Sequence, residues 1–76
     1  MNEIMNSTIQ VHDEECEKYV LGTAMSNANA LAEIREFIND DSFYISKHQA
    51  IWRAMVALED KGINPEIVTV FGELQS

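Results

Sequence analysis

Apolar residues recur at spacings of three and four along most of the chain, and short polar runs separate the repeats. The first repeat begins after Asp13, a good N-cap residue, which is followed by the carboxylates of Glu14, Glu15 and Glu17. Carboxylates in a first turn favour a helix because they face the positive end of its dipole. The apolar stripe of this helix is expected at Cys16, Val20, Thr23 and Ala24, with Tyr19 and Met25 beside it. Gly22 interrupts the stripe, and since glycine costs about 1 kcal/mol inside a helix, we expect another backbone to pass close to it.

A second, shorter helix is expected after the polar run 26–29. Its apolar positions restart the helical spacing before the polar run 39–42 ends it, and they are Ala30, Leu31, Ile34, Phe37 and Ile38. The brief apolar run 43–45 fits a strand or a helical turn, and periodicity alone does not separate the two.

The third helix has the most regular pattern. Ser46 and Gln49 match a capping box at its start, and the stripe then runs through His48, Ile51, Trp52, Met55 and Leu58. Gly62 fits the left-handed position just past the helix end, and Lys61 complements the negative pole of the dipole.

The last helix is expected after Asn64 and Pro65, which match an N-cap and a first-turn proline. The β-branched run 67–70 also fits a strand, but a single helical face collects Ile67, Val70, Phe71 and Leu74. Helix is therefore favoured. We predict an all-α fold, a small orthogonal bundle of four to five short helices over residues 13–76, preceded by a tail over residues 1–12.

The composition is that of one small globular domain. Its 76 residues are 46% apolar and carry a net charge of −8, so the surface repels phosphate and direct binding to nucleic acid is not expected. The single cysteine excludes an intrachain disulfide and favours a reducing, cytoplasmic location. No run approaches the roughly 20 apolar residues that a membrane-spanning helix needs.

Individual residues offer little chemistry. His12 and Cys16 have a spacing at which they could share a metal ion, but this spacing is common by chance and no fourth ligand is marked. His48 is expected at the edge of the core, with one ring nitrogen bonded to backbone or to a carboxylate. Cys16 is expected to pack in the core, with its thiolate disfavoured by Glu15 and Glu17. No phosphate-binding loop or catalytic group of residues is present, so we predict no catalytic, cofactor or metal site in this chain.

Three blocks of residues, in order, resemble the N-terminal domain of bacterial DnaB-type replicative DNA helicases. Residues 15–22 resemble the family's opening Glu-Ala-Glu-x-x-Val-Leu-Gly, and residues 43–55 its Phe-Tyr-x-x-x-His-x-x-Ile-Phe-x-Ala-Met. Residues 62–70 resemble Gly-x-Pro-Ile-Asp-x-Val-Thr-Val. The resemblance implies that the matching residues determine the fold, namely Glu15, Leu21, Gly22, Phe43, Tyr44, His48, Ile51, Trp52, Met55, Val68 and Thr69.

The chain departs from the family pattern in four ways, the first being that Gln10 and Val11 replace the proline pair usually found before the first helix. Ser42 stands where Asp is usual, and Pro65 is shifted by one residue. Glu66 stands where Asp would cap the last helix, so Asn64 is the better candidate for that cap.

The resemblance implies an oligomerisation and primase-docking domain without catalysis. A helical hairpin, a linker and an ATPase domain that uses ATP and Mg would follow residue 76. The expected partners are the C-terminal domain of the primase and further copies of the chain, as a dimer in this fragment and a hexamer in the whole helicase. A free-standing acidic adaptor or inhibitor of a basic protein is the alternative, and a small metal or thiol enzyme is a third.

Overall fold

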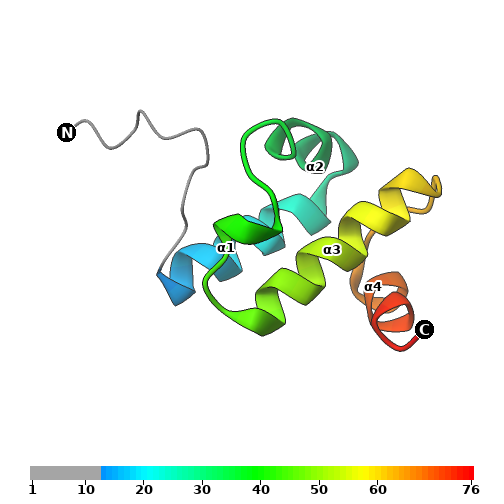
Figure 1. Cartoon of the computed structure of the whole chain (residues 1–76). Coiled ribbons are helices and arrows are strands. Elements are labelled where there is room, and N and C mark those ends of the chain that lie inside the picture. Colours follow the sequence, from blue (N-terminus) through cyan, green and yellow to red (C-terminus); the bar gives the residue numbers. More distant parts are fainter. Residues whose placement is uncertain (1–12) are drawn as a thin grey trace.

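Four α-helices and one 3-10 turn follow one another along residues 13–76, the part of the chain that the computed structural model describes (Figure 1). They are α1 (Glu14–Ser26), α2 (Ala28–Ile34), η2 (Asp40–Ser42), α3 (Ser46–Asp60) and α4 (Ile67–Leu74). These residues contain no β-strand, so the all-α prediction is confirmed. The predicted tail, with His12, lies outside the described residues.

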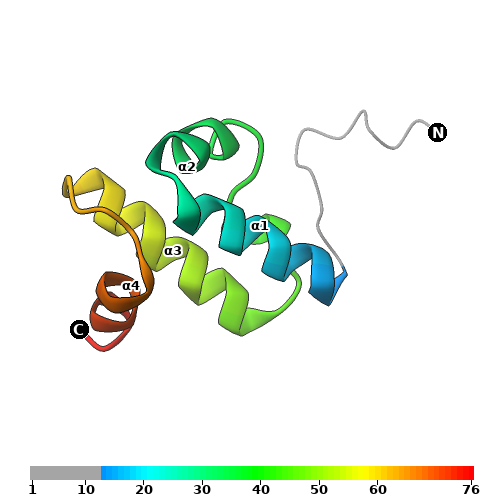
Figure 2. The ribbon, with the colours of Figure 1, turned by 180° about the vertical axis from the view of Figure 1, so that it is seen from behind.

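Helix α3 is the centre of the arrangement. It contacts α1, η2 and α4, while α2 packs against α1. Figures 1 and 2 show α2 and α4 on opposite sides of α3. The core that these elements share consists of Leu21, Ala24, Leu31, Ile38, Phe43, Trp52, Ala54, Met55, Leu58 and Val70. The rings of Phe43 and Trp52 meet in it with their centroids 5.6 Å apart.

Helix α1 begins where the sequence predicts, but it buries a different stripe. Asp13 is the N-cap residue, and the buried side chains are Glu17, Leu21 and Ala24. The expected stripe is wrong at Cys16, which is exposed, but correct at Ala24, which is buried, and Val20 and Thr23 are half-buried. The error has a physical reason: a carboxylate occupies an inward position of α1, so apolar spacing alone points to the neighbouring stripe.

Helix α2 begins two residues earlier than predicted, because a single residue separates it from α1. Asn27 alone separates α1 from α2, and its Oδ1 accepts hydrogen bonds from the backbone N–H groups of Asn29 (2.8 Å) and Ala30 (3.3 Å). The helix also ends earlier, at Ile34. The next residues form turns that leave Phe37 exposed and bury Ile38.

The segment between α2 and α3 is held by local hydrogen bonds. Asn39 Oδ1 accepts from the backbone N–H of Asp41 (2.9 Å), and the Asn39 N–H donates to Ser42 Oγ (3.1 Å). Ser42, a departure from the family pattern, is fully buried in this turn. Phe43 and Ile45 then have extended backbone, so the run 43–45 is a link rather than a helical turn.

Helix α3 matches the prediction in its bounds and its buried face. His48, Trp52, Met55 and Leu58 are buried, and Gly62 has the left-handed φ of 77°. The predicted capping box does not form, since Ile45 is the N-cap residue. Gln49 instead donates from Nε2 to the carbonyl oxygen of Phe43 (2.7 Å).

Helix α4 starts later than predicted, at Ile67, and Glu66 rather than Asn64 is its N-cap residue. Thr69 secures this start, because its Oγ1 accepts from the Glu66 N–H (2.9 Å) and donates to the Asn64 carbonyl oxygen (2.7 Å). Pro65 therefore precedes the cap instead of occupying the first turn. Val70 is the buried residue of the helix.

Two glycines should respond to alanine in opposite directions. An added Cβ at Gly22 would have no atom of the described chain within 4 Å apart from its own helix, so the predicted close backbone is absent there. Gly22→Ala should therefore stabilise the fold by about 1 kcal/mol, through helix propensity. Gly62→Ala should destabilise it by about 1 kcal/mol, because alanine disfavours the left-handed φ of 77°. Urea unfolding of both variants measures the two changes in the free energy of unfolding. Changes of the same sign would contradict the different roles assigned to Gly22 and Gly62.

Candidate functional site

The most tightly bonded group of polar side chains joins α1 to the start of α3. Glu17 is fully buried, and its Oε2 accepts a hydrogen bond from the backbone N–H of Tyr44 (2.7 Å). Its Oε1 accepts from the N–H of Ile45 (3.4 Å) and from Nδ1 of His48 (2.7 Å). One carboxylate thus holds the link 43–45 and the first turn of α3 against α1. We call Glu17 and these three donors the Glu17 clasp.

The charge of Glu17 is stabilised inside the core. Burial by itself raises the pKa of a carboxyl group, because it removes water from the charged form. The hydrogen bonds from Tyr44, His48 and Ile45 act in the opposite direction and outweigh burial, so the pKa of Glu17 lies below its ordinary value of 4.5. The clasp is therefore made by an ionised carboxylate.

The Glu17 clasp confirms the prediction made for His48, but the sequence pattern does not predict the role of Glu17. His48 is a buried imidazole bonded to a carboxylate, as the sequence predicts. The sequence pattern predicts for Glu17 only the role of a first-turn carboxylate facing the helix dipole. The signal that would have found it is the spacing of Glu17, Leu21 and Ala24, a stripe in which Glu17 replaces an apolar residue.

The Glu17 clasp has a structural role. Both carboxylate oxygens are engaged, and the Glu17 side chain has no exposed surface that a substrate could reach. Within residues 13–76 no group of three or more His, Cys, Asp or Glu side chains is placed to hold a metal ion. No helix in that range is long and apolar enough to cross a bilayer.

Cys16 lies on the exposed side of α1, so the prediction that it packs in the core is wrong. Local desolvation and the neighbouring Asp13, by its charge and a hydrogen bond, raise the pKa of the Cys16 thiol. The thiolate is disfavoured, as predicted, but through Asp13 rather than through Glu15 and Glu17.

The residues proposed as fold determinants divide between core and surface. The buried ones are Leu21, Phe43, His48, Trp52 and Met55, and Ile51 packs partly against them. Thr69 is half-buried at the α4 cap. The exposed ones are Glu15, Gly22, Tyr44 and Val68. Tyr44 nevertheless contributes its backbone N–H to the Glu17 clasp.

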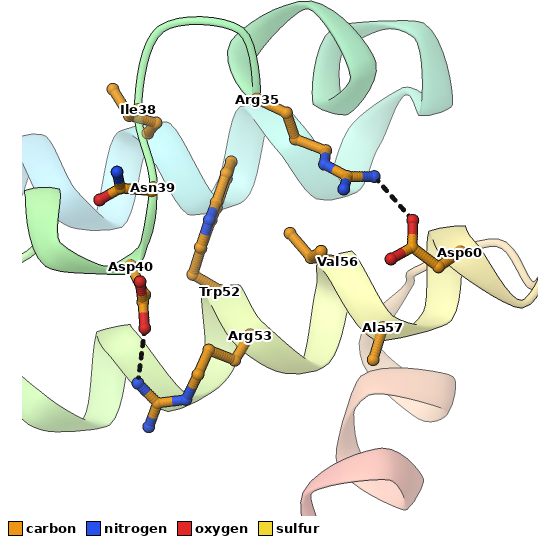
Figure 3. A pocket seen from close by; sticks show the side chains of 9 residues that line it. All are labelled: Arg35, Ile38, Asn39, Asp40, Trp52, Arg53, Val56, Ala57 and Asp60. Carbon is orange, nitrogen blue, oxygen red and sulfur yellow. Dashed lines mark hydrogen bonds and ion pairs between the residues drawn. The ribbon is translucent and has the colours of Figure 1, made fainter. Parts of the chain in front are cut away.

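A groove of about 490 Å³ runs between α3 and the segment 35–40 (Figure 3). We call it the α3 groove, and its lining consists of Arg35, Ile38, Asn39, Asp40, Trp52, Arg53, Val56, Ala57 and Asp60. An ion pair stands at each end: Arg53 with Asp40 (3.0 Å), and Arg35 with Asp60 (3.1 Å). Arg35 also pairs with Glu59.

The second surface feature is an uncharged apolar face on α4. Ile67, Val68, Phe71 and Leu74 are exposed by 73%, 76%, 61% and 44%, and we call them the α4 face. The prediction that Ile67, Val70, Phe71 and Leu74 form one face is correct for the helix. Only Val70 of that set is buried, however. Contiguous exposed apolar residues of this kind mark surfaces that other elements or chains cover.

Removing the charge of Glu17 should weaken the fold and change its response to acid. Glu17→Gln should lower the free energy of unfolding by about 2 kcal/mol at pH 7, the usual effect of losing hydrogen bonds to a buried charged acceptor. Because the pKa of Glu17 is depressed in the folded chain, its stabilisation is complete above pH 4.5 and is lost as the pH falls through the lower folded-state pKa. The variant should lack this part of the acid dependence.

Urea unfolding between pH 7 and pH 3 measures both effects of Glu17→Gln. Glu14→Gln is the matched control, because it removes an exposed carboxylate from the same turn and should change stability by less than about 0.5 kcal/mol. Equal losses in the two variants would show that the clasp contributes nothing beyond surface charge.

The comparisons with known proteins agree with this fold. The family model described as "DnaB-like helicase N terminal domain" matches residues 9–76. The chain is 35% identical to the replicative DNA helicase DnaB of Treponema pallidum, over 95% of this chain and 16% of the relative. It is 35% identical to the replicative DNA helicase DnaC of Bacillus subtilis, over 97% of this chain and 16% of the relative.

A third relative, the replicative DNA helicase DnaB of Geobacillus stearothermophilus, is 34% identical over 97% of this chain and 16% of its own length. The chain therefore spans about one sixth of the curated relatives it matches. No solved structure matches it significantly. With a family model that covers all four helices and relatives above 30% identity along nearly the whole chain, the chain belongs to the family of DnaB-like helicase N-terminal domains.

Proposed function

We propose that this chain is the oligomerisation and primase-docking part of a replicative, ATP-dependent DNA helicase. The observation that carries the proposal is the family match over residues 9–76, together with relatives that are replicative DNA helicases. The domain itself performs no catalytic step in this proposal. ATP and Mg belong to an ATPase part of the helicase, and fork unwinding in the cytoplasm is the work of the whole protein.

The charge distribution supports docking to proteins rather than to DNA. The net charge is −8, and four of the five cationic side chains already form ion pairs, namely Lys18, Arg35, Arg53 and Lys61. A surface of this kind has few free cations with which to neutralise phosphates. We therefore propose that the ATPase part of the helicase binds nucleic acid, whereas this domain recruits partner proteins.

The α4 face supports self-association. Two copies that each carry a charge of −8 repel one another, so contact is least unfavourable where a surface carries no charge. The α4 face meets this condition, because its four side chains are apolar. Pairing it with the same face of a second copy would bury both patches in a symmetric contact.

Self-association is tested by sedimentation of the 76-residue chain and two serine variants. Phe71→Ser on the α4 face should weaken the dimer about tenfold or more, because Phe71 supplies much of the apolar surface that the contact buries. Phe37→Ser is the matched control, since Phe37 is 62% exposed against 61% for Phe71 but lies away from α4. It should leave the dimer unchanged. A monomer at all concentrations, or equal effects of both substitutions, would count against the α4 contact.

The helicase assignment is tested by the gene and by binding. The coding sequence past Ser76 should encode a helical hairpin and then a Walker motif, whereas a stop codon there would favour the free-standing adaptor. Titration with the C-terminal domain of the primase from the same genome should give saturable binding. No binding to that domain, with salt-sensitive binding to another basic protein, would overturn the docking role.

A further inference from the structure

The α3 groove brings together features that the rest of the surface does not. It follows one face of α3 through Trp52, Val56 and Asp60, about 12 Å of helix at the standard rise per residue. The only two arginines of the chain line it, and so does its only tryptophan. Figure 3 shows the apolar middle between the two ion pairs.

The arginines of the groove are not available to an anion. Arg53 pairs with Asp40, and Arg35 pairs with Glu59 and Asp60, whose hydrogen bonds raise the pKa of the Arg35 guanidinium. Two arginines and two aspartates in the lining cancel, and Glu59 beside them leaves a small negative excess. In a chain of charge −8, this groove favours a cationic occupant over a phosphate or a second copy.

The shape of the groove favours an apolar anchor. Apart from the ion-paired residues and Asn39, the lining consists of Ile38, Trp52, Val56 and Ala57, and a volume of about 490 Å³ lies in the range of sites that bind small ligands. Amphipathic helices bind apolar grooves by placing side chains one turn apart on the floor. Cationic side chains at both ends of such a helix would meet Asp40 Oδ1 and Asp60 Oδ2, the carboxylate oxygens that are not bonded to Arg53 and Arg35.

We propose that the α3 groove binds one short amphipathic helix of a basic partner protein, with two apolar side chains over Trp52 and Val56, which lie one turn apart on α3, and Lys or Arg beside Asp40 and Asp60. The proposal goes beyond the oligomerisation and docking role, because it names a surface and a chemistry for the partner. It is independent of the α4 face, which lies on another helix.

The test uses the tryptophan of the groove as its reporter. The probe is a capped 12-residue helical peptide with two leucines one turn apart and lysines on its other positions, and a peptide with glutamates in place of the lysines is its control. The lysine peptide should shift the Trp52 fluorescence and the Trp52 indole N–H resonance in a saturable way, and the glutamate peptide should not. Binding that leaves both Trp52 signals unchanged would overturn the proposal.

Two charge-matched variants separate the groove from the general field of the protein. Asp60→Asn removes a carboxylate from the groove and should weaken binding of the lysine peptide about tenfold. Glu14→Gln removes a carboxylate from α1 and should change binding by less than about twofold. Equal weakening would show that only net charge attracts the peptide and would reject the groove.

A third variant tests the apolar floor and separates it from self-association. Ala57→Gln should abolish the Trp52 shift, with circular dichroism verifying that the fold is kept. Val68→Gln on the α4 face should leave the shift intact even where it lowers self-association. A shift lost in Val68→Gln but kept in Ala57→Gln would assign peptide binding to α4 and overturn the proposal, while leaving the oligomerisation role standing.

Discussion

The arrangement of α1 and α3 depends on one buried carboxylate. Glu17 accepts hydrogen bonds from two backbone N–H groups of the link before α3 and from His48 within it, and these contacts span 27 to 31 positions of the chain. Apolar packing alone permits helices to slide and rotate, because it is not directional. The clasp adds directional contacts that fix where α3 begins, and the start of α3 in turn positions the α3 groove and the packing of α4 against α3.

The sequence was most informative where apolar spacing is long and uninterrupted. The bounds and buried face of α3 followed from a stripe of His48, Trp52, Met55 and Leu58, and Gly62 marked its end. It was least informative where one polar side chain has a tertiary role. Glu17 looks like any first-turn carboxylate until His48 and Tyr44 are seen beside it, and such partners are invisible to local periodicity.

The predicted starts of α2 and α4 were wrong for a related reason, because single polar side chains determine them. Asn27 both ends α1 and caps α2, so a break predicted over four residues occupies one. At α4, Glu66 and Thr69 form the cap that the sequence predicts at Asn64. The α3 groove could not be predicted, because it requires the position of the segment 35–40, which the second helix is predicted to occupy up to Ile38.

Helix α4 packs against α3 but buries few side chains of its own. Val70 is its buried side chain, and an ion pair between Lys61 and Glu73 (3.0 Å) is its charged tether. Such an element opens at a lower free energy than the centre of α3, so its amides should lose protection first in hydrogen exchange. Any chain that covers the outer side of this helix also closes that opening. Assembly and local folding of the last helix are therefore thermodynamically linked, and the order of the helix depends on the concentration of whatever binds it.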